Sequence, residues 1–293
     1  MTRRRLDVLE TGPLALVEDT GRPGLADLGV SRSGAADRRS FALGARLLAQ
    51  DETYAAIEVT FGGLSVRAGG DLLVALTGAP APATVHAKGG SERGIGFDAP
   101  FRLRHKETLT LGSPTSGLRS YLSVRGGIDV PAELGSRSTD VLSGLGPARL
   151  EAGDVLPIGP APAAFPSVDQ APVEPIAGTP LRLHVIPGPR DDWLADLAEL
   201  TRTRWTVCSD SDRVGVRLTG GQVRYRSDKQ GADLPSEGVV RGAIQIPSGG
   251  EPVLFLADHP VTGGYPVVGV IAAADVDRLA QAAPGQEILL TVR

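Results

Sequence analysis

The sequence predicts a mainly β protein that is built from two domains. Its 293 residues exceed the size of one small module. Gly (38) and Pro (23) together make about a fifth of the chain, which is typical of short strands joined by tight turns. Hydrophobic residues reach 41% but aromatic residues only 4%, so we expect a sizeable core of Val, Leu, Ile and Ala.

The N-terminal half alternates short apolar segments with turn residues. Residues 6–30 predict two short strands, broken at Gly12-Pro13 and at the turn over 21–24. A helix is expected over 35–50, with Ser33 as a possible N-cap. Glycine pairs separate three further strands, and more strands follow later, within residues 55–78, 101–111 and 119–125.

A proline-rich stretch divides the chain. Residues 157–180 contain seven prolines, which exclude a helix or a central strand there. We take this stretch as the link between an N-terminal domain, 1–165, and a C-terminal domain, 166–293. The C-terminal domain is expected to begin with a strand at 181–186 and to contain two helices, at Asp191–Leu200 and Asp275–Gln281.

Composition and missing motifs exclude several classes of function. A net charge of −4 without a basic tail gives no electrostatic basis for binding nucleic acid. No apolar run is long enough to span a membrane, and the single Cys excludes an intrachain disulfide. The four histidines lack metal-ligand spacing, so we expect no metal site. No P-loop, GxGxxG, GxSxG or HExxH motif occurs. We expect a cytoplasmic protein.

Five polar clusters in glycine-rich loops remain as candidates for chemistry. Their arginines suit carboxylate or phosphate oxygens, and their glycines let a ligand approach the backbone. Each cluster also has an ordinary structural interpretation as a turn salt bridge, a helix cap or a solvated turn. The clusters are Glu18–Gly24, Ser31–Asp37, Gly135–Asp140, Ser209–Arg217 and Asp258–Pro266.

Taken together and in this order, the clusters resemble the allophanate hydrolase subunit 2 family, also called the biotin-dependent carboxyltransferase-like or KipA/PxpC family. The resemblance runs from about residue 6 to 293, and further matching segments include Ile57–Val59, Ala75–Ala79, Tyr121–Ile128 and Gly242–Pro247. The chain departs from the family pattern at Glu18, at Gly44-Ala45 and at His259–Val261. Because polar groups near a ligand decide specificity, these departures affect the choice of substrate.

The resemblance implies two cyclophilin-like β-barrel domains with a few short helices. It also implies a subunit of an ATP-dependent 5-oxoprolinase, which opens the 5-oxoproline lactam to glutamate. Such a subunit works in a hetero-oligomer with a KipI/PxpB-type protein (allophanate hydrolase subunit 1) and a LamB/YcsF-type third subunit, with ATP shared among them. Two alternatives stay open. One is a KipA-like regulatory protein that antagonises a kinase inhibitor. The other is the carboxyltransferase part of a urea carboxylase or allophanate hydrolase system, which would use biotin from another chain.

Activating an unreactive amide needs fixed donors facing a developing oxyanion and an arginine that holds an anion. We therefore predict Asp19, Arg22 and Arg137 as catalytic residues, with Arg22 or Arg137 as anion clamp and Asp19 as orienter or base. The hydroxyl and glycine positions are predicted to bind a small amide substrate, with Tyr265 as donor or lid. No nucleophile is evident, so we expect half of a shared site. The substrate-binding residues are Ser33, Gly34, Asp37, Ser136, Ser138, Thr262, Gly263, Gly264 and Tyr265.

Overall fold

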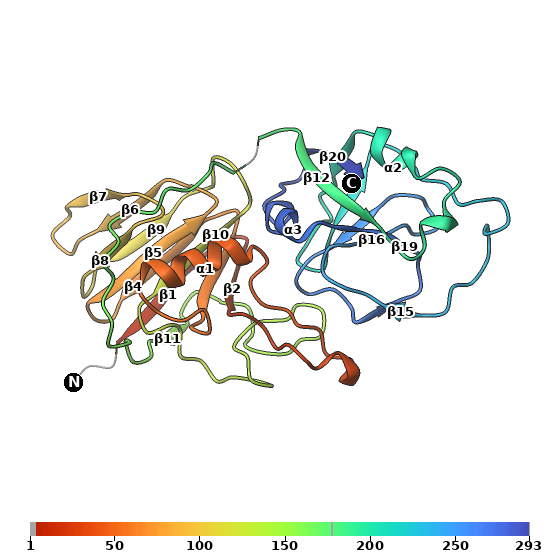
Figure 1. The fold of residues 1–293 in the computed structure, drawn as a ribbon. Coiled ribbons are helices and arrows are strands. Elements are labelled where there is room, and N and C mark those ends of the chain that lie inside the picture. The colour runs from red at the N-terminus through yellow and green to blue at the C-terminus, as the bar shows by residue number, and fades with distance from the viewer. Residues whose placement is uncertain (1–3, 177, 293) are drawn as a thin grey trace. The chain divides into compact units, whose positions relative to one another are not determined.

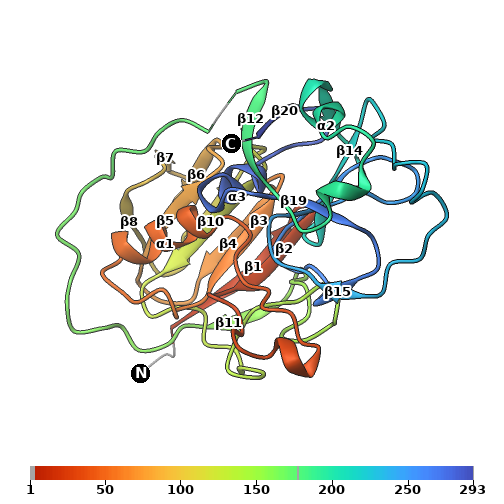
Figure 2. The same ribbon diagram turned by 45° about the vertical axis from the view of Figure 1, so that its right-hand side comes forward.

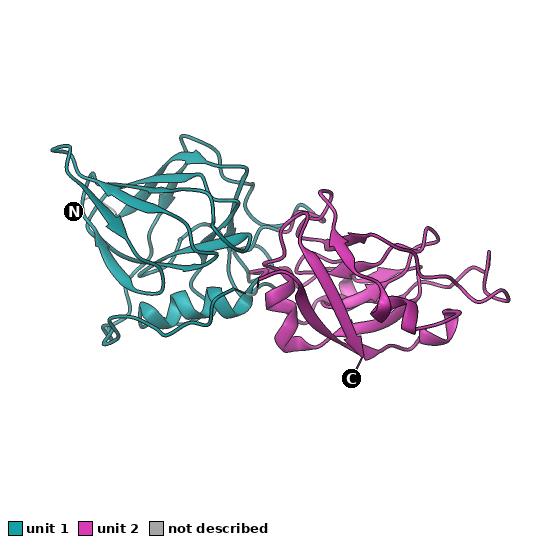
Figure 3. Ribbon diagram, turned by 90° about the horizontal axis from the view of Figure 1, so that it is seen from above, with its two compact units in different colours: residues 1–22, 37–139, 144–176 teal, residues 23–36, 140–143, 177–293 magenta. Residues whose placement is uncertain are grey.

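The computed structural model describes residues 4–176 and 178–292, which form two compact units (Figures 1 and 3). The first unit contains residues 1–22, 37–139 and 144–176, and the second contains residues 23–36, 140–143 and 177–293. The units therefore differ from the predicted domains 1–165 and 166–293. The proline-rich stretch stays with the first unit as far as residue 176, and two short segments of the N-terminal half belong to the second unit.

The first unit consists of two antiparallel sheets that share one core. Their buried side chains are Leu, Val, Ile and Ala, as the composition predicts. The larger sheet has the order β11 (Val155–Pro157), β1 (Arg5–Thr11), β4 (Leu64–Ala68), β9 (Thr108–Leu111), β6 (Ala83–His86) and β7 (Glu92–Ile95). The other has the order β2 (Leu14–Glu18), β3 (Ala56–Thr60), β10 (Arg119–Val124), β5 (Leu72–Gly78) and β8 (Pro100–Leu103).

Helix α1 (Arg38–Leu47) lies across strands β5 and β10 of the second sheet (Figure 1). It begins after Asp37, whose carboxylate accepts hydrogen bonds from the Ser40 amide (3.0 Å) and hydroxyl (2.6 Å). The prediction of Ser33 as the N-cap is therefore wrong: Ser33 lies before the helix, with a left-handed φ of 53°. Gly44 permits close packing, because a Cβ there would come within 2.3 Å of the Ser123 hydroxyl.

The second unit is a closed barrel of seven strands. Its strands pair antiparallel except for β12 and β20, which run parallel. The order is β12 (Leu181–Pro187), β19 (Val267–Ile271), β16 (Ala243–Gln245), β17 (Val253–Phe255), β14 (Gly215–Thr219), β13 (Trp205–Val207) and β20 (Glu287–Val292). Short strands β15 (Glu237–Gly238) and β18 (Thr262–Gly263) form a separate pair. The mainly β prediction is confirmed, although only this unit forms a closed barrel among the described residues.

Short helices complete the second unit. Helix α3 (Ala273–Leu279) lies close to the predicted position. The predicted helix Asp191–Leu200 is wrong as one element, because it divides into a 3-10 turn (Asp191–Trp193) and α2 (Ala198–Arg202). Between them Leu194 is extended, its backbone forms an isolated β-bridge with Tyr225, and its side chain packs into the core of the second unit. A further 3-10 turn lies at Ala26–Leu28.

The proline-rich stretch runs along the outside of the first unit as a long loop (Figure 2). Up to residue 176, only its first residue is in a strand, the edge strand β11, as expected from its prolines. Side-chain and backbone donors attach the rest: Arg125 donates to the carbonyls of Pro162 and Ala164, and the Ala171 amide donates to the Asp98 carbonyl. In the described part of the chain, no helix is long and apolar enough to cross a membrane.

Asp98 is a half-buried acid, and its buried Oδ1 has no hydrogen-bond partner among the described residues. Burial raises its pKa to about 6. The folded state thus holds the proton more tightly than the unfolded chain, and the ionised carboxylate costs stability as the pH rises through about 6. We expect Asp98→Asn, which tolerates the left-handed φ of 61°, to stabilise the protein at pH 8 by about 1–3 kcal/mol.

That gain should fall by about half at pH 5, because the wild-type carboxyl is then mostly protonated in the folded state. Urea denaturation at both pH values measures it. The matched control is Asp169→Asn, an exposed acid in the same unit, which should change stability by less than about 0.5 kcal/mol. An equal gain from Asp98→Asn at both pH values would show that ionisation of this carboxyl is not the cause.

Candidate functional site

The carboxylate of Asp19 organises a cluster of predicted site residues in the first unit. It follows strand β2 and is only 4% exposed. Its Oδ1 accepts hydrogen bonds from the hydroxyls of Ser136 and Ser138, both at 2.6 Å, and from the Gly21 amide at 2.8 Å. Its Oδ2 accepts the Arg137 amide at 2.6 Å. With four donors on it, Asp19 holds the 136–138 loop in place and is poorly suited to act as a base.

Arg22 lies against the same loop and is 1% exposed. Its Nη2 donates to the Ser138 carbonyl at 2.6 Å, and its Nε makes a longer contact of 3.4 Å to the Glu133 carbonyl. Its Nη1 is buried and has no hydrogen-bond partner among the described residues. Gly146 permits this packing, since a Cβ there would come within 2.0 Å of the Ser138 carbonyl oxygen. A buried charged donor without an acceptor is costly and marks a candidate contact for an external anion.

Arg137 joins the Asp19 cluster only through its backbone. Its side chain turns to the Val130 carbonyl, which accepts from Nε at 2.7 Å, and to Asp129, whose Oδ1 accepts from Nη2 at 3.1 Å. The predicted clamp residues Arg22 and Arg137 therefore carry guanidinium groups with different surroundings. Arg22 is buried beside Ser138, whereas the side chain of Arg137 is 34% exposed.

Asp37 belongs to a second buried network of the first unit. Its amide donates to the Tyr121 hydroxyl at 2.8 Å, which in turn donates to Glu58 at 2.7 Å. Glu58 also faces Arg119 at 3.5 Å. Burial raises the pKa of Tyr121 well above its usual value, and the charges of Glu58 and Asp37 raise it further. With its carboxylate capping α1, Asp37 serves the fold, and this network was not anticipated from sequence.

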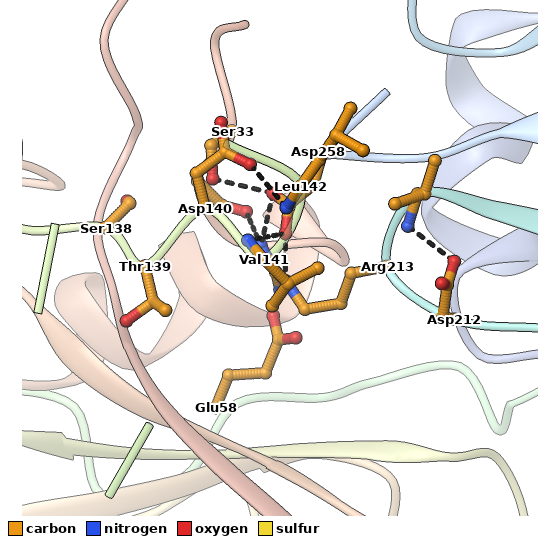
Figure 4. A network of polar contacts seen from close by, with 12 residues as sticks. Ser33, Glu58, Ser138, Thr139, Asp140, Val141, Leu142, Asp212, Arg213 and Asp258 are labelled. Atoms are coloured by element: carbon orange, nitrogen blue, oxygen red, sulfur yellow. Dashed lines mark hydrogen bonds and ion pairs between the residues drawn. The ribbon is translucent and has the colours of Figure 1, made fainter. Parts of the chain in front are cut away.

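Ser33 and Gly34 lie in the second unit, in a network centred on Asp258 (Figure 4). The Asp258 carboxylate is fully buried and accepts the Ser33 hydroxyl at 2.6 Å. Arg213, 1% exposed, donates to it through Nε (2.8 Å) and Nη2 (3.1 Å). The same Nη2 donates to the Gly34 carbonyl, and the Val141 amide donates to Asp258. The network thus joins segments 23–36 and 140–143 to the barrel.

Asp140 is a second buried carboxylate of this unit, in addition to Asp258. It accepts the Ser31 hydroxyl at 2.6 Å and the amides of Leu142 and Ser143. Burial raises the pKa of Asp140, but the hydrogen bonds from Ser31, Ser143 and Leu142 outweigh burial and hold that pKa below its usual value. Asp140 therefore stays ionised and holds the 140–143 turn.

The predicted loop Thr262–Tyr265 lies elsewhere in the second unit. Thr262 and Gly263 form strand β18 opposite β15. Gln245, 5% exposed, donates to the Tyr265 carbonyl at 3.0 Å and packs so closely that a Cβ on Gly263 would meet its Nε2 at 2.5 Å. The Tyr265 side chain is 48% exposed. Within the described ranges, neither the Thr262 hydroxyl nor Gly264 makes a polar contact that would assign it a role.

The structure brings together Asp19, Arg22, Ser136 and Ser138, and separately Ser33 and Gly34. Arg213, Asp258 and Gln245 were not predicted as site residues, although all three lie in segments that carry the family resemblance.

Gln245 could have been found as an amide side chain between Ile244 and Ile246, whereas Arg213 and Asp258 lie just outside strands β14 and β17 without such a local signal. We refer to the residues around Asp19 and those around Asp258 as the two clusters. No hydroxyl described in either cluster contacts a His base, and the described residues contain no group of three potential metal ligands. The clusters offer fixed donors and charge, without an activated nucleophile.

Relatives of the chain cover nearly its whole length. It is 34% identical to a 5-oxoprolinase subunit of Escherichia coli (strain K12), over 97% of this chain and 89% of the relative. It is also 34% identical to urea amidolyase of Saccharomyces cerevisiae, over 92% of this chain but 15% of that protein. The solved structure of Kluyveromyces lactis urea carboxylase superposes with a TM-score of 0.90 and 29% identity, over 100% of this chain and 28% of that one.

The chain therefore spans most of the bacterial relative but only a small part of the fungal proteins. The model of the family described as carboxyltransferase domain, subdomain A and B, matches residues 28–292. This match includes both units and all the predicted site residues except Asp19 and Arg22. The chain belongs to the carboxyltransferase domain family, subdomains A and B.

Proposed function

We propose that this chain is a subunit of an ATP-dependent 5-oxoprolinase, which opens the lactam of 5-oxoproline to glutamate. The observation that carries the proposal is the nearly full-length similarity to a bacterial 5-oxoprolinase subunit, at 34% identity over 97% of this chain and 89% of the relative. The corresponding 5-oxoprolinase subunit from Haemophilus influenzae is 30% identical over 97% of this chain.

The subunit is proposed to act with a KipI/PxpB-type protein and a LamB/YcsF-type third subunit. Opening the lactam breaks its C–N bond and adds one water, and negative charge develops on the amide oxygen. In an ATP-driven route the γ-phosphoryl group of ATP is first transferred to that oxygen, ADP leaves, and phosphate is released when water attacks the ring carbon. This chain supplies hydrogen-bond donors that are already fixed in place. The main one is the buried guanidinium of Arg22, which is hydrogen-bonded to the loop that Asp19 holds. Because neither cluster contains an activated nucleophile among its described residues, we assign the delivery of the phosphoryl group and of water to the partners.

The described residues fit poorly to ATP, so we place its triphosphate on one of the partner proteins. The first turn of α1 is capped by the Asp37 carboxylate, which would repel phosphate at the site where a helix usually attracts it. The lysines are Lys88, Lys106 and Lys229, and none lies in either cluster. ATP is then consumed by the assembly rather than bound by this chain alone.

The second candidate is the carboxyltransferase part of a urea carboxylase, supported by the similarity to the fungal urea amidolyase and urea carboxylase. Biotin would have to come from another chain, since no Ala-Met-Lys-Met sequence is present. The donors of both clusters suit urea as well as a lactam. Near full-length coverage of the bacterial relative favours the 5-oxoprolinase assignment.

The first prediction of function concerns the complete assembly. The chain is co-purified with its KipI/PxpB-type and LamB/YcsF-type partners, and glutamate formation from 5-oxoproline is followed with and without ATP. We expect ATP-dependent glutamate that disappears when this chain is omitted, because its donors complete the site.

The control assembly receives urea, bicarbonate and a biotinylated carrier in place of 5-oxoproline. Carboxylation of urea without glutamate formation would replace the first function by the second. A stable complex in which turnover does not depend on this chain would favour a KipA-like regulatory role.

A second prediction concerns Arg22. Arg22→Lys keeps the charge but loses the planar fork and its extra donor, so we expect ATP-dependent glutamate formation to fall at least tenfold. Loss of one hydrogen bond to the loop should lower stability by only about 1–2 kcal/mol. Activity is measured well below the melting temperature, which differential scanning fluorimetry provides. Arg149→Ala, at an exposed arginine of the same unit, should leave both quantities unchanged. Wild-type turnover in Arg22→Lys would remove Arg22 from the site.

A further inference from the structure

A cavity of about 240 Å³ opens in the first unit, apart from the Asp19 carboxylate. Its walls include Tyr54, Gly126, Gly127, Asp129, Arg137 and Gly159. All of these residues belong to the first unit, so the cavity is complete within it. None of the roles described above uses this space.

The charged donor of the cavity is the guanidinium group of Arg137, and it is fixed before any ligand arrives. Its Nε is held by the Val130 carbonyl at 2.7 Å and its Nη2 by Asp129 at 3.1 Å. The backbone amide of the same residue is held by Asp19 at 2.6 Å. Nη1 has no partner among the described residues, so one N–H edge of a positioned guanidinium remains available. Such preorganisation lowers the entropy cost of binding.

Part of the cavity wall is backbone without side chains, because glycines pack there too closely for a Cβ. A Cβ on Gly126 would come within 2.3 Å of the Gly159 carbonyl oxygen, and one on Gly127 within 2.9 Å of the Tyr54 ring. The φ angles of Gly126 and Gly127 are also left-handed, at 102° and 68°. The backbone amides of these glycines are already bonded, to Gln50 and to the Val124 carbonyl. Arg137 is therefore the group that would select an anion.

Size and charge define the class of ligand. A volume of about 240 Å³ lies below the range typical of drug-sized ligands and nucleotides, which leaves molecules of amino-acid size. Asp129, 35% exposed, already offsets part of the charge of Arg137. Because the Asp129 carboxylate also lines the cavity, it repels a ligand with two negative charges, such as phosphate, more strongly than a ligand with one. A planar carboxylate also matches the guanidinium edge.

We propose that the Arg137 cavity is a binding site for a small monocarboxylate of amino-acid size, held through Nη1 of Arg137. The site is independent of the proposed function, although 5-oxoproline and glutamate both belong to this class. The backbone link to Asp19 would connect occupancy of the cavity with the loop that carries Ser136 and Ser138.

The test is isothermal titration calorimetry, in which the full chain is titrated separately with 5-oxoproline, L-glutamate, 2-pyrrolidinone and inorganic phosphate. We expect at least one of the two carboxylates to bind, and 2-pyrrolidinone, which has the lactam without the acid, to bind at least tenfold more weakly. Arg137→Ala should weaken carboxylate binding at least tenfold. Arg67→Ala removes another half-exposed, ion-paired arginine of the same unit and should bind as the wild type does.

Several results would overturn the proposal. These are no carboxylate binding by the wild type at ligand concentrations up to about 50 mM, unchanged binding in Arg137→Ala, or Arg137-dependent binding of phosphate alone. If Arg137→Ala is not folded by circular dichroism, Arg137→Lys provides the test. Its point charge should retain carboxylate binding at reduced affinity, and full affinity would exclude a role for the guanidinium edge. Because binding is measured without turnover, a failure here leaves the proposed 5-oxoprolinase activity to its own assay.

Discussion

The buried ion pair between Arg213 and Asp258 is the constraint on which the second unit depends. Both side chains are almost fully buried, so each charge must be paired where it lies. Breaking such a pair costs about 3–5 kcal/mol, because the remaining charge is stranded away from water. Asp258 also accepts from Ser33 and from the Val141 amide. One carboxylate thereby holds two segments, distant in sequence, on a barrel formed mainly by the C-terminal third of the chain.

Asp19 has the corresponding role in the first unit, where its carboxylate positions a loop as Asp258 does in the second unit. Three of its four donors lie about 117 residues further along the chain. A carboxylate whose two oxygens accept four hydrogen bonds from the protein is used to fix a loop. Of the predicted roles for Asp19, the geometry therefore favours orienter over base. Two guanidinium groups at this loop keep a donor without a partner among the described residues: that of Arg22 beside the loop and that of Arg137 within it.

The sequence was sufficient wherever the controlling interactions are local. Glycine pairs separate the strands β3, β4 and β5, and the scarcity of aromatic residues correctly predicts an aliphatic core. Prediction failed where a distant partner decides. Leu194 follows helical periodicity but pairs with Tyr225, and Ser33 has the chemistry of a cap but bonds to Asp258. No spacing rule connects Asp19 to Ser136. The family resemblance marks both segments as matching ones, but only the three-dimensional structure shows which of their atoms form contacts.

Arg22 and Arg137 each have a guanidinium donor without a partner among the described residues, and the two donors differ in the acceptor that would satisfy them. Nη1 of Arg22 is buried without a hydrogen-bond partner among the described residues, so an acceptor supplied by a ligand or a partner protein would satisfy it. Arg137 lines an open cavity, where water can occupy the anion position until a small anion replaces it. An unsatisfied buried donor costs about 1–3 kcal/mol, so the first arrangement gains stability when a complex supplies the acceptor, whereas the second has no such cost in the isolated chain. A non-autonomous subunit is therefore expected to bind a small acid before assembly and to complete its buried donor only within the complex.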